Sequence, residues 1–169
     1  MELTGRGSMA KGLDLSTPTD QVTFGQNNFD QMLTSITGIG TGSSQANQWF
    51  HDERSILTTA NDDLDLAGGL TSSFGETITF AIVKILVVAI DTPDGSKKLR
   101  VGPQAVANAW QGPWGGTGAT VYTDVLDWAV LVNDKWTGIA VTAGTGDILR
   151  LNNPTGGTVI YRIFIAGEV

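Results

Sequence analysis

The longest apolar stretch of the chain covers residues 77–90, and apolar side chains occupy both of its alternating faces. Its residues are mostly β-branched or aromatic, a composition that favours a strand over a helix. Because both faces are apolar, we expect a central strand covered on both sides, with a bend near Lys84, the one charge in its middle. The stretch is too short for a membrane-spanning helix. A second layer is therefore needed, and the pattern predicts a sandwich, a barrel or an oligomer.

Shorter strand-like segments flank this stretch. Each combines β-branched or aromatic residues with period-two alternation and is bounded by turn residues. The other expected strands cover residues 55–59, 64–66, 98–101, 119–123, 126–132, 138–142, 147–151 and 158–166. We expect 98–101 to pair with the central strand, 138–142 to form a hairpin with 147–151, residues 61–63 to form a turn, and Trp128 to lie in the core. About eight to ten strands in this arrangement predict an all-β fold, a β-sandwich or jelly-roll-like single domain.

The chain before residue 49 has a different composition. Residues 10–48 are rich in Thr, Ser, Gln, Asn, Asp and Gly, and their apolar residues come mostly singly. This predicts an extended, loosely packed N-terminal arm, or alternatively an arm that becomes ordered only against a partner. The first eight residues are typical of a cloning leader. We therefore divide the chain into a leader (1–8), an arm (9–48) and a β-sandwich domain (49–169).

Composition and charge narrow the function classes. The 169 residues include 22 glycines, which suit many short strands joined by tight turns, and no cysteine, which excludes disulfides and thiolate metal sites. The net charge of −7 at pH 7 argues against a general nucleic-acid binder, which would carry a basic face. No signal peptide or transmembrane segment is recognised. These features favour an acidic β domain with neither nucleic acid nor membrane among its partners.

The sequence gives little support for catalysis or a cofactor. His51 is the single histidine, and no Gly-x-Ser-x-Gly motif supplies a nucleophile for it. One His and no Cys leave too few ligands for zinc. Residues 61–65 (Asn-Asp-Asp-Leu-Asp) bring several oxygen ligands together, so a calcium site is an alternative to a solvated turn, but the EF-hand spacing is missing. We predict a protein that is not an enzyme and uses no cofactor.

Four of the candidate interface residues each allow more than one interpretation. Trp110 and Trp114 flank a loop rich in Gly and Pro, where an indole could pack within the protein, anchor a protein partner or stack on a sugar ring. Lys84 and Arg162 are single cations on otherwise apolar strands. Each could extend its charged head to water or an acid, or meet a carboxylate across a subunit contact, because an unpaired buried charge is costly.

Several phrases of the sequence are similar to those of small virion structural proteins of tailed bacteriophages. They are residues 51–57 (HDERSIL), 63–80 (DLDLAGGLTSSFGETITF), 141–152 (VTAGTGDILRLN) and 161–167 (YRIFIAG). The resemblance covers most of the chain after the arm, with a weaker match over residues 91–136. It implies a non-enzymatic β-sandwich of the capsid decoration (cement) type, a kind of protein that is often a trimer bridging neighbouring capsid subunits. It offers no catalytic residue to assign.

Together these observations predict a virion structural protein on the capsid surface. Its partners would be the major capsid protein and further copies of itself in a homotrimer. The alternatives are a carbohydrate-binding module and a β-sandwich protein associated with a tail or baseplate. The candidate interface residues are Trp49, His51, Arg54, Lys84, Trp110, Trp114 and Arg162.

Overall fold

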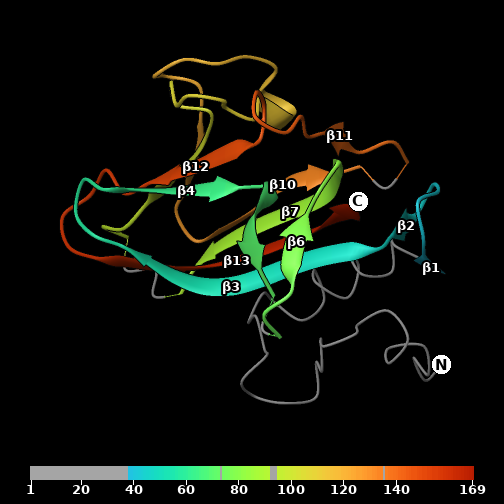
Figure 1. Ribbon diagram of the computed structural model, residues 1–169. Helices are drawn as coiled ribbons and strands as arrows, with labels where there is room; N and C mark the ends of the chain where they lie inside the picture. The colour runs from blue at the N-terminus through green and yellow to red at the C-terminus, as the bar shows by residue number, and fades with distance from the viewer. Residues whose placement is uncertain (1–37, 73, 92–94, 135) are drawn as a thin grey trace.

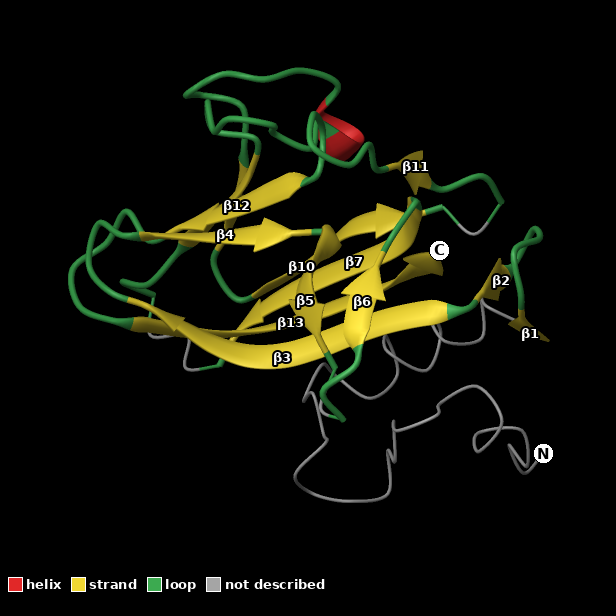
Figure 2. Ribbon diagram, viewed as in Figure 1, coloured by secondary structure: helices red, strands yellow, loops and turns green. Residues whose placement is uncertain are grey.

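The protein is a β-sandwich of two antiparallel sheets, shown in Figure 1 as a computed structural model. The structure describes residues 38–72, 74–91, 95–134 and 136–169. The larger sheet has the strand order β10-β7-β13-β3, with β11 paired to one end of β7, and the smaller sheet has the order β4-β12-β8-β9. In Figure 2, β4 and β12 lie in one layer above β7, β13 and β3. The all-β, sandwich-like fold predicted from the sequence is confirmed.

The strand bounds are as follows. The larger sheet contains β3 (Gln48–Ile56), β7 (Ile82–Ile90), β10 (Trp128–Asn133), β11 (Ile139–Ala140) and β13 (Val159–Glu168). The smaller sheet contains β4 (Asn61–Asp65), β8 (Leu99–Gly102), β9 (Thr123–Val125) and β12 (Ile148–Asn152). The shorter pairs are β1 (Gly38–Ile39) with β2 (Gln45–Ala46), and β5 (Ala67–Thr71) with β6 (Thr77–Thr79). The only helix in the described ranges is a single 3₁₀ turn, η1 (Gly112–Trp114). None of the described residues form a helix long and apolar enough to cross a membrane.

The hydrophobic core lies between the two sheets. Inward-pointing residues of the larger sheet, such as Val88 and Ile163, join one cluster with Leu149 and Leu151 of the smaller sheet. Along β12 and β8 these buried residues alternate with polar ones, the pattern of a sheet with one covered face. Because strands of both sheets contribute to one cluster, the sandwich forms a single core.

The predicted central strand is confirmed from Ile82 onward and is broken before it. β7 lies between β10 and β13, and eight of its nine residues are buried. Residues 77–79 instead form β6, which pairs with β5 in a separate hairpin. The ladder is interrupted at Phe80 and Ala81, where the buried Phe80 and the exposed Ala81 lie outside any strand.

A β-bulge in β7 lies at the predicted bend near Lys84. The pairing with β13 passes from Ile85 directly to Val83, so Lys84 is the extra residue. The insertion reverses the alternation of the strand, and Val83 and Leu86 therefore both face the core. Gly167 of β13 allows the two strands to approach here, because a Cβ atom at this position would overlap the backbone of β7.

Two predicted pairings and one predicted turn are wrong. The pairings fail because strands that are neighbours in the chain join different sheets. Strand β8, predicted at 98–101, pairs with β12 and β9 and not with the central strand. Residues 138–142 and 147–151 form no hairpin: β11 pairs with β7, whereas β12 pairs with β4 and β8. Residues 61–63 do not turn the chain but begin strand β4.

Part of the predicted arm is attached to the end of the larger sheet. The ammonium group of Lys84 donates hydrogen bonds to the carbonyl oxygens of Gly42 (2.7 Å) and Gln45 (2.8 Å). The amide of Asn47 donates to the carbonyl of Gly167 at 3.0 Å. The predicted leader and residues 9–37 of the arm lie outside the described residues, so the division into leader, arm and domain stays a prediction.

Candidate protein interface

The larger sheet has an apolar surface on the side that points away from the core. We call this surface the outer face and define it by the outward-pointing residues of β10, β7, β13 and β3. Strand register places these residues in three rows across the sheet. The rows are Val130–Val87–Phe164–His51, Trp128–Ala89–Arg162–Glu53 and Ile85–Ala166–Trp49.

The middle of the outer face is buried, and one margin of it is exposed. Ile85 and Val87 are 0% exposed and Phe164 is 3% exposed, although none of the three belongs to the core cluster. On the edge strand β10, Trp128 is 39% exposed and Val130 is 37% exposed. We call these two residues the β10 margin. The prediction that Trp128 lies in the core is wrong, because its side chain points to the opposite side of the sheet.

Three of the candidate interface residues come together on the outer face. Trp49 and His51 lie on β3 and Arg162 lies on β13, and all three are half-buried. Arg162 forms ion pairs with Glu53 at 2.9 Å and with Asp91 at 2.6 Å. Its carboxylate partners therefore come from its own chain. This agrees with the interpretation that Arg162 extends to an acid of the same chain, and not with a carboxylate across a subunit contact.

Lys84 also finds its carboxylate partner within the chain. Its side chain is buried and forms an ion pair with Glu168, the last residue of β13. The two backbone carbonyls of Gly42 and Gln45 complete the surroundings of the ammonium group. A buried cation needs such a set of partners, because desolvation costs more than one hydrogen bond returns. Lys84 is thus an attachment point for residues 38–48 and not a surface contact.

Arg54 lies on the core side of the larger sheet, away from the outer face. It donates to both carboxylate oxygens of Asp62 (2.6 and 3.0 Å) and to Asp52 (2.9 Å). The buried hydroxyl of Tyr161 donates to the same Asp62 at 2.9 Å. The hydrogen bonds that Arg54 donates to Asp62 raise the pKa of Arg54, while burial, followed by the nearby Asp62 charge, raises the pKa of Tyr161. This cluster connects β3 and β13 to β4 of the other sheet.

The two tryptophans of the Gly/Pro-rich loop pack against each other. Trp110 is 1% exposed, and its indole N–H donates to the carbonyl of Ala140 at 2.8 Å. Trp114 is half-buried, lies edge-on to Trp110 with 6.3 Å between the ring centroids, and donates to the hydroxyl of Thr123 at 3.0 Å. Of the three sequence interpretations, packing within the protein is the one that describes Trp110.

Sequence reasoning missed the exposed apolar residues at and beside the β10 margin. Leu126, Trp128 and Val130 recur at every second position and are all exposed. The residues between them, Asp127 and Ala129, are polar or small. This alternation places the three side chains on one side of the strand, but such an apolar side ordinarily faces the core, so the pattern itself favours the wrong side for Trp128.

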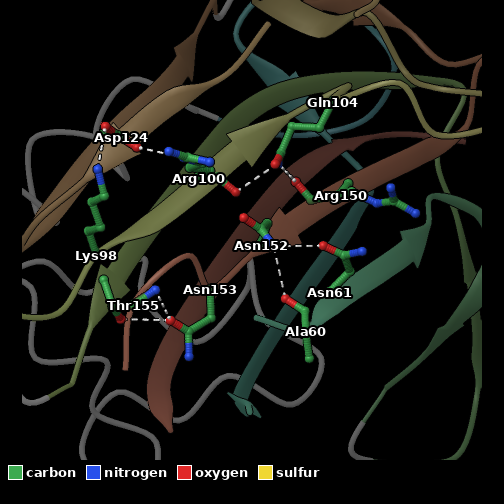
Figure 3. Close-up of polar contacts among 10 residues, drawn as sticks. All are labelled: Ala60, Asn61, Lys98, Arg100, Gln104, Asp124, Arg150, Asn152, Asn153 and Thr155. Carbon is green, nitrogen blue, oxygen red and sulfur yellow. Dashed lines mark hydrogen bonds and ion pairs between the residues drawn. The ribbon is translucent and has the colours of Figure 1, made fainter. Parts of the chain in front are cut away.

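The outward side of the smaller sheet is polar, in contrast to the outer face (Figure 3). Arg150 of β12 forms two hydrogen bonds of 2.7 Å with Asp63 of β4, which raise the pKa of Arg150. Asn152 donates to Asn61 at 2.8 Å, and Lys98 pairs with Asp124 at 3.2 Å. In the part of the chain that the structure describes, no group of three or more His, Cys, Asp or Glu side chains is arranged to hold a metal ion.

No protein-family model matches this chain, and no curated protein matches it either.

Proposed function

We propose that this protein is a non-enzymatic virion structural protein that decorates or cements a phage capsid by binding neighbouring capsid subunits. The sequence resemblance to tailed-phage virion proteins supplies the biological setting. The observation that carries the proposal is the β10 margin, where Trp128 and Val130 leave apolar surface in contact with solvent on an edge strand.

Physical chemistry supports a protein partner at this margin. Tryptophan is enriched at the centres of protein interfaces, where it buries a large area at a small cost in conformational entropy. An edge strand offers backbone N–H and C=O groups that a second chain can pair with. Exposed apolar side chains on such an edge promote aggregation of a monomeric protein, whereas in a protein that assembles they form part of an interface.

Shell binding by purified full-length protein tests the proposal. Shells assembled from the major capsid protein encoded with this chain are mixed with the protein, and the bound fraction is measured by sedimentation. Trp128→Ser should weaken binding by at least about 30-fold, the effect of losing an interface hot spot of about 2 kcal/mol. Leu57→Ser, which changes an exposed apolar residue in the β3–β4 turn, should leave binding unchanged. Equal weakening by both variants, or no binding by the unchanged protein, would contradict the proposal.

Oligomeric state and ligand screening address the remaining parts of the proposal. A homotrimer should appear by analytical ultracentrifugation, in solution or after release from shells. Binding to tail or baseplate proteins in place of shells would favour the tail-associated alternative. A glycan array with Trp114→Ala as the comparison variant would reveal a carbohydrate-binding module, through glycan binding that this variant loses.

A further inference from the structure

One edge of the sandwich differs in charge from the other three. The two sheets end in β10, β3, β4 and β9, and each of these strands has one side on which no other described strand pairs with it. Edge strands of natural proteins commonly carry charged side chains, which discourage pairing with another chain. β3, β4 and β9 contain such charges, whereas no residue of β10 is charged. The charged residues are Asp52, Glu53, Arg54, Asp62, Asp63, Asp65 and Asp124.

The backbone groups of β10 that point away from the sheet belong to Trp128 and Val130. In an antiparallel pair, only every second residue exchanges hydrogen bonds with the facing strand. The amide of Ile90 donates to the carbonyl of Asp127 at 2.6 Å, so Asp127 and then Ala129 direct their N–H and C=O groups to β7. The N–H and C=O groups of Trp128 and Val130 therefore lie on the open side of the strand.

The open side of β10 has room for a short added strand. Leu131 is an extra residue in the pairing with β7, so the regular part of the edge covers residues 127–130. The exposed side chains of Trp128 and Val130 stand beside their outward backbone groups on the outer face. Aromatic and β-branched residues stabilise a neighbouring strand through cross-strand contacts. An added strand would thus gain both backbone hydrogen bonds and apolar contacts.

The charge around this edge favours a different protein over a second copy. No Lys or Arg lies between Arg100 and Lys135, and the exposed Asp127 directly precedes β10. Each copy has a net charge of −7, and a net charge of this size keeps like molecules apart. The complementary partner is an extended segment with apolar residues facing Trp128 and Val130 and a basic residue beside Asp127.

We propose that β10 binds the capsid subunit by strand addition. An extended segment of that subunit pairs with the outward N–H and C=O groups of Trp128 and Val130 and becomes the next strand of the larger sheet. This inference rests on the proposed function and specifies how its partner is held. Docking through side chains needs only the apolar surface of the β10 margin, whereas strand addition also needs the backbone of Val130.

Deletion of one outward N–H in the full-length protein tests the strand addition. In Val130→α-hydroxyisovalerate an ester replaces the amide and the valine side chain is kept. Binding to the shells should weaken by at least about 5-fold, because a backbone acceptor of the partner loses its donor. Unchanged binding by this variant would overturn strand addition, and the proposed function would stand if Trp128→Ser still weakened binding. Failure of the unchanged protein to bind shells would overturn both.

The matched control is an ester on a charged edge. Ser55 of β3 pairs with Ile160 of β13, and the carbonyl of Ile160 accepts from the amide of Asp91 at 3.0 Å on the β7 side. The N–H of Ser55 therefore also points away from its sheet. Ser55→lactate should leave shell binding unchanged, and the two free esters should unfold at similar urea concentrations. Equal weakening of shell binding by both esters would overturn the proposal.

Two further readouts decide between occupants. Hydrogen exchange resolved to single amides should be at least about 10-fold slower at Trp128 and Val130 on shells than in the free protein, because pairing protects an amide. Unchanged exchange at both amides would overturn the proposal. Self-association of the free protein, measured by analytical ultracentrifugation and abolished by Val130→α-hydroxyisovalerate, would overturn it in favour of a second copy.

Discussion

The two outward surfaces of the sandwich differ in chemistry although both belong to antiparallel sheets. On the smaller sheet, outward residues such as Asp63, Arg150 and Asn152 are polar and pair with one another across the strands. On the larger sheet, Val87 and Phe164 occupy the corresponding positions and are buried. The first surface is the ordinary solvated side of a two-layer protein, and the second is an interior surface. The comparison teaches that two antiparallel sheets sharing one core can carry opposite chemistry on their outward sides, polar on the smaller sheet and apolar on the larger one.

The largest expected effect comes from the buried charge pair at the end of the outer face. Lys84→Met leaves Glu168 buried without its cation, so the free energy of unfolding should fall by about 3–5 kcal/mol. Guanidinium chloride unfolding followed by tryptophan fluorescence measures this change. In the double variant Lys84→Met/Glu168→Gln, most of the loss should be recovered. A loss below about 1 kcal/mol in the single variant would show that the pair is solvated.

The second effect measures whether the outer face is an interior surface. Phe164→Ala should lower the free energy of unfolding by about 3 kcal/mol, because it opens a cavity in a packed layer. Ile160→Ala on the same strand, at a partly exposed position, is the control and should cost less than half as much. Equal small losses in the two variants would place Phe164 on an ordinary surface and remove the contrast between the two sheets.

A smaller effect is expected where the two sheets are joined by polar contacts. Tyr161→Phe removes one hydrogen bond to Asp62, which keeps its contact with Arg54, so the loss at neutral pH should be about 1 kcal/mol. The pH dependence is more specific, because burial raises the pKa of Tyr161 in the folded protein above its ordinary value of about 10. The unfolded chain then loses this proton first. The contribution is complete below about pH 10 and is lost as the pH rises beyond it.

Urea unfolding between pH 9 and 11 checks this linkage. The unchanged protein should lose stability more steeply above about pH 10 than Tyr161→Phe does, by up to about 1.4 kcal/mol per pH unit for the one proton concerned. Parallel curves for the two proteins would mean that Tyr161 ionises equally in the folded and unfolded states.

The smallest effect is expected on the polar surface of the smaller sheet. Arg150→Ala breaks the ion pair with Asp63, which is partly exposed, and should cost no more than about 1 kcal/mol. Repeating the denaturation in about 1 M salt should shrink the difference further, because salt screens exposed charges. A loss as large as that of Phe164→Ala would mean that this ion pair is buried and not solvated.

The sequence predicts the type of structure well and its pairing poorly. The β-branched residues of β7 and the alternation along β13 identify two central strands. Burial of one or both faces of a strand determines which of its positions are apolar, and this pattern can be recognised in the sequence. The partner of β12 leaves no such trace: β4 and β8 are distant in the chain, and the prediction of a hairpin assumed that neighbours pair. The break at Ala81 was missed because alanine is compatible with a strand or a bend.

The candidate interface shows the same limit. Trp49, His51 and Arg162 were identified as candidates, and the register of β3 with β13 brings them together. Trp128 was placed on the wrong side, because it shares one side of the strand with Leu126 and Val130, and an apolar side that alternates with polar or small residues ordinarily faces the core. The partners of Lys84 could not be foreseen, since Glu168 lies on a strand that only the folded topology brings beside it.

The position of β13 has a consequence for how the protein is made. This strand follows every other strand that the structure describes, yet it lies between β7 and β3 and holds the larger sheet together. During translation, its two neighbours must wait, unpaired along one edge, until residues 159–168 have left the ribosome. A product released before this strand is made would expose unpaired backbone groups on β7 and on β3, and these edges could pair with other chains. Pairing within the larger sheet therefore becomes complete only after residues 159–168 have been synthesised.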